Sequence, residues 1–133
     1  ASTSTGARLV REVSIHLQDE TLTTYEEAVR SGSTPGTHPV AFAVAGAALE
    51  VRATAIVAAL LFGTASVLLS AAMRLLPVSH RDVQGALHRL RPDIDALAPE
   101  VVASAYAPLT SYHPLQEIAS MRHRAAPVRF FAS

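Results

Sequence analysis

The sequence predicts an all-α fold, a compact helical bundle around one central apolar helix at about residues 52–76. Three observations support this class. Apolar residues recur at helical spacing, no stretch alternates with the period of a strand, and Ala, the best helix former, occurs 25 times in 133 residues. Hydrophobic residues make up 50% of the chain and aromatic residues 5%, which indicates a core of aliphatic and small side chains. We expect a single domain over residues 1–133.

The first quarter of the chain is polar and predicts two helices. Apolar residues recur on one helical face over residues 5–17. A second, short helix is expected to begin after Thr23 or Thr24, with acidic residues in its first turn, and to end near Gly32. The Ser-, Gly- and Pro-rich stretch 31–37 is a loop that joins this polar quarter to the apolar core.

The middle of the chain predicts two apolar helices. Residues 37–39, Thr-His-Pro, are typical of a helix start, and that helix continues to Leu49. Between Arg52 and Arg74, the 21 residues Ala53–Met73 carry no charge, which is long enough to cross a bilayer. Small and hydroxyl residues make this segment only moderately hydrophobic, so we favour a helix buried in a bundle. A small helical membrane protein with this segment as its span is the alternative.

Prolines and a capping box divide the next part of the chain. Pro77 ends the central helix. Ser79 and Asp82 have the spacing of a capping box, so the next helix is expected to begin there and to end at Pro92. One or two short helices interrupted by Pro99 are expected to follow.

The last predicted helix begins near Pro114 and finishes before Pro127. Its apolar residues fall at helical spacing, so they are expected to face the core. They are Leu115, Ile118, Ala119 and Met121.

Charge and composition exclude several function classes. The chain has 11 Lys+Arg and 11 Asp+Glu, so it lacks the net positive charge that would attract nucleic acid or an anionic membrane. It has no Cys, which removes disulfides, thiolate chemistry and Cys-based metal sites, and which is compatible with a cytoplasmic protein. Every one of its basic side chains apart from His is Arg, so neither Schiff-base chemistry nor a Walker-type phosphate loop is available.

The sequence offers no defensible catalytic or metal site. The six His residues lie at 16, 38, 80, 88, 113 and 123, and none forms the i, i+4 pair of a metal site. No Ser lies in a nucleophile elbow. We therefore expect no catalytic residue, no metal ligand and no cofactor. A hydrolase that uses one isolated His stays an alternative, and it would need a pocket that holds a base and a nucleophile together.

The end of the chain has the composition of a protein interface. After Glu117, 16 residues carry no acid but include arginines and the aromatic pair Phe130 and Phe131. Arg and aromatic residues dominate binding hot spots, so this tail is a candidate for partner binding. The alternative is that both Phe rings fold back onto their own domain.

Several motifs resemble a known family. Residues 114–123 read Pro-Leu-Gln-Glu-Ile-Ala-Ser-Met-Arg-His, which is similar to the DIASMRHE signature of the urease accessory protein UreF family. Residues 129–133, Arg-Phe-Phe-Ala-Ser, resemble the family's C-terminal Arg-Leu-Phe-x-Ser. Residues 36–42 look like its G-x-HPV-x-F motif, residues 70–77 like SAAVRL-x-P, and residues 5–9 like its GR-x-LL helix.

The resemblance implies an all-helical, non-enzymatic chaperone of nickel enzyme maturation. Family members bridge UreD (called UreH in some systems), the GTPase UreG and apo-urease, so that nickel reaches the active site. Nickel and GTP would then be handled by partner proteins. The resemblance gives Arg122, His123, Arg129 and Phe130 a part in partner docking or in fixing the C-terminal segment, and we add Phe131 from the composition of the tail.

The chain also departs from the family pattern. His80 stands where a Gln is common, and Arg124 stands where a Glu follows the His, which reverses a charge. The family's N-terminal region, with much of its dimer-forming surface, has no counterpart in this sequence, so a homodimer is left open.

Overall fold

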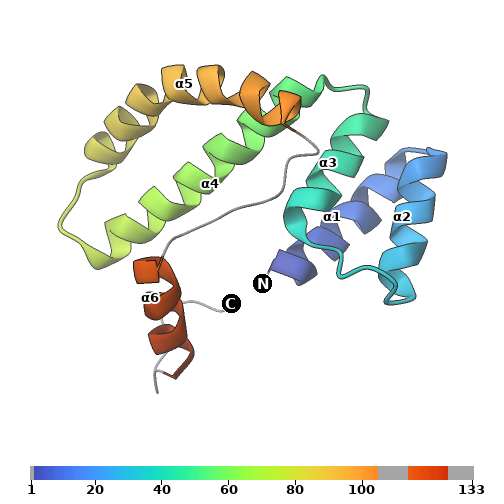
Figure 1. Ribbon diagram of the computed structural model, residues 1–133, viewed down its shortest axis with the longest axis horizontal. Helices are drawn as coiled ribbons and strands as arrows, with labels where there is room; N and C mark the ends of the chain where they lie inside the picture. Colours follow the sequence, from blue (N-terminus) through green and yellow to red (C-terminus); the bar gives the residue numbers. More distant parts are fainter. Residues whose placement is uncertain (1, 105–113, 126–133) are drawn as a thin grey trace.

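The computed structural model describes residues 2–104 and 114–125, and within these ranges it holds six helices and no strand. The predicted all-α class is confirmed. In Figure 1, α1, α2 and α3 form one group, while α5 arches along α4, and the contact of α3 with α4 joins the two parts. The helices are α1 (Ser2–His16), α2 (Glu20–Arg30), α3 (His38–Ala48), α4 (Ala53–Leu75), α5 (His80–Ala103) and α6 (Pro114–Ala125).

The first three helices enclose a small aliphatic core. Val10 of α1, Leu22 of α2 and Ala41 of α3 are fully buried and pack together. The start of α2 differs from the prediction, because its N-cap is Asp19 instead of a threonine at 23 or 24. The Asp19 carboxylate accepts a hydrogen bond of 2.8 Å from the backbone N–H of Leu22, which satisfies a donor that the first turn leaves open.

A close backbone approach fixes α1 against the start of α3. Gly6 is buried, and a Cβ atom placed on it would lie 2.2 Å from the carbonyl oxygen of Gly36. Gly36 itself has φ +63°, a left-handed conformation that glycine adopts without strain. The backbone N–H of His38 donates to the Ser2 hydroxyl at 3.2 Å. Glycine at position 6 is therefore a packing requirement of this joint.

The central apolar helix is less buried than its composition predicts. α4 packs along α5 and touches α3, yet Ile56 is its one buried residue. Val67 and Leu68 are 70% and 66% exposed. The expectation of a helix enclosed on all sides is therefore wrong within the described part of the chain, because its neighbours cover only part of its circumference. α4 also has the length and composition of a membrane span, with mean hydropathy 2.2, a test that core helices of soluble proteins pass as well.

The helix α5 begins as predicted and ends later. The Ser79 hydroxyl accepts from the Asp82 N–H at 3.2 Å, and the Asp82 carboxylate accepts from the Ser79 N–H at 2.9 Å, so the capping box is confirmed. The prediction that Pro92 ends this helix is wrong, since α5 runs on through Pro92 and Pro99 to Ala103. Pro92 and Pro99 are both exposed, and they lie on the same side of the helix because seven residues are close to two turns. Proline has no backbone N–H, so the carbonyl group four residues before each proline loses its helical hydrogen bond. On the exposed side that carbonyl group can bond to water while α5 bends around α4.

Candidate partner-binding surface

The C-terminal helix α6 is amphipathic, and its apolar side meets no other helix within the described residues. In the described residues no other helix packs against it. Leu115 is 81% exposed, Ile118 42% and Met121 52%. The expectation that these residues, with Ala119, face the core is therefore wrong, and Ala119 is exposed as well. The apolar residues do recur at helical spacing, but no helix in residues 2–104 packs against them.

The exposed side of α6 combines apolar and cationic groups. At 100° per residue, Leu115, Ile118 and Arg122 fall within about 60° of one another, because they occupy positions i, i+3 and i+7. Arg122 is also exposed. Met121 and Arg122 are of the residue types that are enriched at protein interfaces, and Leu115 and Ile118 add exposed apolar surface beside them. We call Leu115, Ile118, Met121 and Arg122 the α6 face.

The predicted partner-binding residues are only partly placed by the structure. Arg122 lies on the α6 face, and His123 follows it in the same helix, although its side chain is outside the described part. Arg129, Phe130 and Phe131 lie outside the described residues. Their role in binding therefore stays a prediction.

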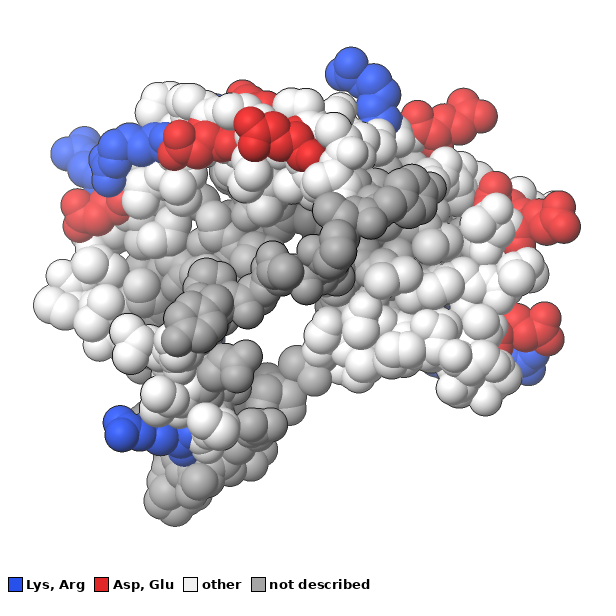
Figure 2. Space-filling model, in the orientation of Figure 1, with Lys and Arg blue, Asp and Glu red and all other residues white. Residues whose placement is uncertain are grey.

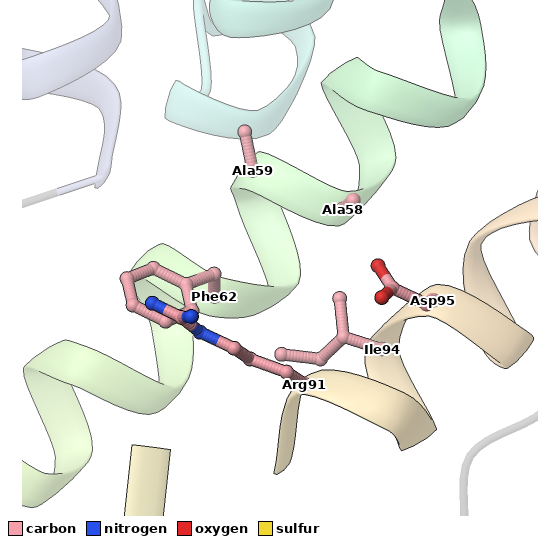
Figure 3. Close-up of a pocket in the computed structure, with 6 residues that line it drawn as sticks. All are labelled: Ala58, Ala59, Phe62, Arg91, Ile94 and Asp95. Carbon is pink, nitrogen blue, oxygen red and sulfur yellow. The ribbon is translucent and has the colours of Figure 1, made fainter. Parts of the chain in front are cut away.

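A second surface feature lies between α4 and α5. A cavity of about 310 Å³ is lined by Ala58, Ala59, Phe62, Arg91, Ile94 and Asp95. Figure 3 shows Arg91 extending from α5 toward Phe62 of α4, with Ile94 beside it. This lining offers one carboxylate and one guanidinium and contains no His, so this cavity is not the site of a hydrolase that uses one of the isolated His residues.

One His shares a groove with hydroxyl groups. His38 lies near Ser2 and Thr5 along a groove beside α4. Its backbone N–H, and not its ring, bonds to Ser2, while the imidazole lies 5.8 Å from the ring of Phe42. The His38 ring therefore has an aromatic neighbour in this groove. Among the described side chains, no three His, Cys, Asp or Glu residues gather as a metal site would require.

The pKa shift of Asp82 comes mainly from the neighbouring Ser79. Hydrogen bonds from the side chain and then the backbone of Ser79 lower the pKa of the Asp82 carboxyl below its usual value. This carboxyl caps α5 and is exposed, so its pKa reflects a structural role in the helix.

Comparison with known proteins gives a consistent result. The sequence model of the UreF family matches residues 1–91. Proteins named "Urease accessory protein UreF" from Yersinia enterocolitica, Yersinia pestis and Yersinia pseudotuberculosis are 34% identical over 133 residues. The match takes in 99% of this chain and 58% of each relative, so the chain spans little more than half of their length. No solved structure matches the chain.

Proposed function

Because this chain belongs to the UreF family, we propose that it is a non-enzymatic urease accessory protein that holds UreD (UreH) and the GTPase UreG on apo-urease during nickel insertion. The observation that carries the proposal is the agreement of the family match over residues 1–91 with the 34% identity to UreF proteins over 99% of the chain. The alternative of a small membrane protein is not favoured, since a family of accessory proteins accounts for the same sequence.

The proposal assigns scaffolding, and no chemistry, to this chain. Nickel and GTP would be bound by the partner proteins, and the complex would form in the cytoplasm. A scaffold of this kind acts on a GTPase only through a difference in its affinity for the two nucleotide states. UreG would therefore be held in one state and released when its nucleotide changes.

The α6 face is the proposed contact with the partner proteins. Its apolar residues are accessible in this chain, and Arg122 offers a charged hydrogen-bond donor beside them. A partner that covers Leu115, Ile118 and Met121 would remove from water the apolar surface that the fold leaves open. Arg129, Phe130 and Phe131 would extend this contact along the tail.

Point variants on α6 test the proposed contact. Ile118→Glu places a charge at the centre of the α6 face and should weaken capture of UreD or UreG about 30-fold or more, as for a hot-spot residue. Arg122→Glu should also weaken capture of UreD or UreG, and the binding that is left should depend less on salt concentration. The matched control is Ile15→Glu on α1, because Ile15 is 67% exposed and lies on another helix.

A truncation after Glu117 tests the longer segment, including Arg129, Phe130 and Phe131. Loss of both partners is expected, while α1 to α5 stay folded because the truncation removes residues of α6 alone among the six helices. If the truncated chain and Ile118→Glu both retain UreD and UreG at the level of Ile15→Glu, the C-terminal segment is not the partner contact. Urease activation in cells that carry each variant then shows whether binding and maturation change together.

A further inference from the structure

Helices α1 to α5 form two groups with separate buried residues. In the first group, Val10, Leu22 and Ala41 come from α1, α2 and α3, pack together and are fully buried. In the second group, three residues of α5 are buried, and α4 is the one helix that α5 contacts in the described part of the chain. Each group therefore has buried residues that do not depend on the other group. Those of α5 are Val83, Leu87 and Ala98.

The two groups meet at one small contact. Within the described residues, α3 is the one helix of the first group that touches α4. Ile56, the buried residue of α4, lies against Gly46 of α3, because a Cβ atom placed on Gly46 would lie 2.7 Å from the Cδ1 atom of Ile56 and 2.8 Å from its Cγ1 atom. Farther along α4, a groove of about 560 Å³ lies between Phe42 of α3 and Leu60 of α4. In Figure 1 the two groups diverge away from the contact.

The contact between the groups is apolar. It is made by the side chain of Ile56 against the backbone of Gly46. In Figure 2, most charged side chains stand over α5 and at the outer side of α1 and α2. The strength of this contact therefore depends mainly on the burial of one aliphatic side chain.

The connection between the groups, residues 49–52, is strained. Glu50 has φ 57°, a left-handed conformation that disfavours a side chain. Its N–H donates to the Ala47 carbonyl oxygen at 2.9 Å, and the Val51 N–H donates to that of Gly46 at 2.9 Å. In helix ends with these two bonds, the left-handed residue is usually glycine, and the residue after it packs on a side chain at the position of Gly46. Neither condition is met, and Val51 is 43% exposed. Rotation at Glu50 would release the strain.

We infer that these residues form a hinge. The α4–α5 pair turns as one body relative to α1–α3, about residues 49–52 and the contact of Ile56 with Gly46. The strain at Glu50 keeps the two arrangements close in free energy. A partner protein that contacts both groups would favour one arrangement, whereas a partner that contacts one group alone would leave the equilibrium unchanged.

Distances between pairs of spin labels measure this motion, and the labels can be attached to single cysteines because the chain has none of its own. The pair Ile15→Cys with Arg89→Cys spans the hinge. Two control pairs lie within one group each, Ile15→Cys with Thr24→Cys, and Val67→Cys with Arg89→Cys. All four positions are exposed, so the labels leave the buried residues undisturbed. Pulsed electron paramagnetic resonance gives the distribution of distances for each pair.

The pair across the hinge should show one main distance and a minor second distance, whereas each control pair should show a single distance. Gly46→Ala places a methyl group against Ile56 and should raise the fraction at the second distance about 10-fold. Ile56→Ala removes the same contact without a clash and should change the fraction in the same direction. Glu50→Gly removes the strain and should lower the fraction about two-fold.

Two results would overturn the inference. A single distance across the hinge in the parent, in Gly46→Ala and in Ile56→Ala shows that the two groups form one rigid body. Control pairs that broaden as much as the pair across the hinge show that the substitutions loosen the whole chain. None of these measurements depends on binding of UreD or UreG, so the hinge is tested separately from the proposed function.

Discussion

Substitution of Gly6 by Ala tests the backbone joint between α1 and the start of α3. The added Cβ atom would lie 2.2 Å from the Gly36 oxygen, 2.7 Å from the carbonyl carbon of Thr37 and 2.8 Å from the nitrogen of His38. All three are backbone atoms, so no flexible side chain can yield. To reach an ordinary contact of 3.4 Å from the Gly36 oxygen, the two segments must separate by about 1.2 Å.

The loss of stability depends on the residues that pack around Gly6 and Gly36. Gly36 is in close contact with Val29, since a Cβ atom on Gly36 would lie 2.8 Å from its Cγ1, so the loop cannot simply retreat. The shift therefore passes to the packing of Val10 against Ala41, both fully buried. Overpacking of this kind costs about 3 kcal/mol, and the better helix propensity of Ala returns about 1 kcal/mol. We expect a net loss of about 2 kcal/mol in the free energy of unfolding, or about 8 °C in Tm.

Thermal and urea unfolding followed by circular dichroism measure this change. Gly63→Ala is the matched control, because it is the same substitution inside a helix where the Cβ atom meets nothing within 4 Å. It should stabilise the chain by about 1 kcal/mol. The reasoning is refuted if Gly6→Ala is as stable as the parent, or if the two variants shift Tm in the same direction.

Three further substitutions have expected outcomes. The Tyr25 hydroxyl is buried and has no hydrogen-bond partner among the described residues, so Tyr25→Phe should leave the free energy of unfolding unchanged or raise it by up to about 1 kcal/mol, and a clear loss in urea unfolding would contradict this. Glu50 has φ 57°, so Glu50→Gly should stabilise by about 0.5 kcal/mol, while Glu50→Ala, which keeps the left-handed strain, should show no gain in the same assay. The folded-state pKa of Asp82 is lowered by Ser79, so its contribution to stability is present above the unfolded value of 3.8 and is lost as pH falls through the folded value. The Tm difference between the parent and Asp82→Asn should therefore be constant from about pH 7 to 5 and shrink below about pH 4, and a difference that grows in acid would refute this assignment.

Local signals in the sequence predicted local structure well. The capping box of Ser79 and Asp82, the start of α3 at His38 and the end of α4 before Pro77 all depend on residues within one turn of each other. The cap of α2 was missed although its signal was present. Asp19 is a strong capping residue, but two threonines farther along offered the same chemistry, and sequence alone does not rank such competing caps.

Features that depend on neighbours were predicted less well. The apolar pattern of α4 shows which residues could be buried, but the neighbouring elements decide how many of them are. In the described fold only Ile56 of this helix is buried. The same applies to Leu115 and Ile118 on α6. Pro92 was expected to end a helix, but a helix can continue through an interior proline when it bends there, because the bend moves the carbonyl group of residue i−4 away from the proline ring.

The family motifs divide into two physical kinds. Gly6 and Gly36 belong to different motifs, and they touch each other through a backbone contact that no larger residue fits, so these motifs describe how the fold is joined. Ile118 and Arg122 belong to the C-terminal signature and are exposed, so no packing within the described chain accounts for them. The exposure of these two residues supports the proposal that the α6 face contacts another protein. This is why a variant of Gly6 should change stability first, and a variant of Ile118 should change partner capture while the helices stay intact.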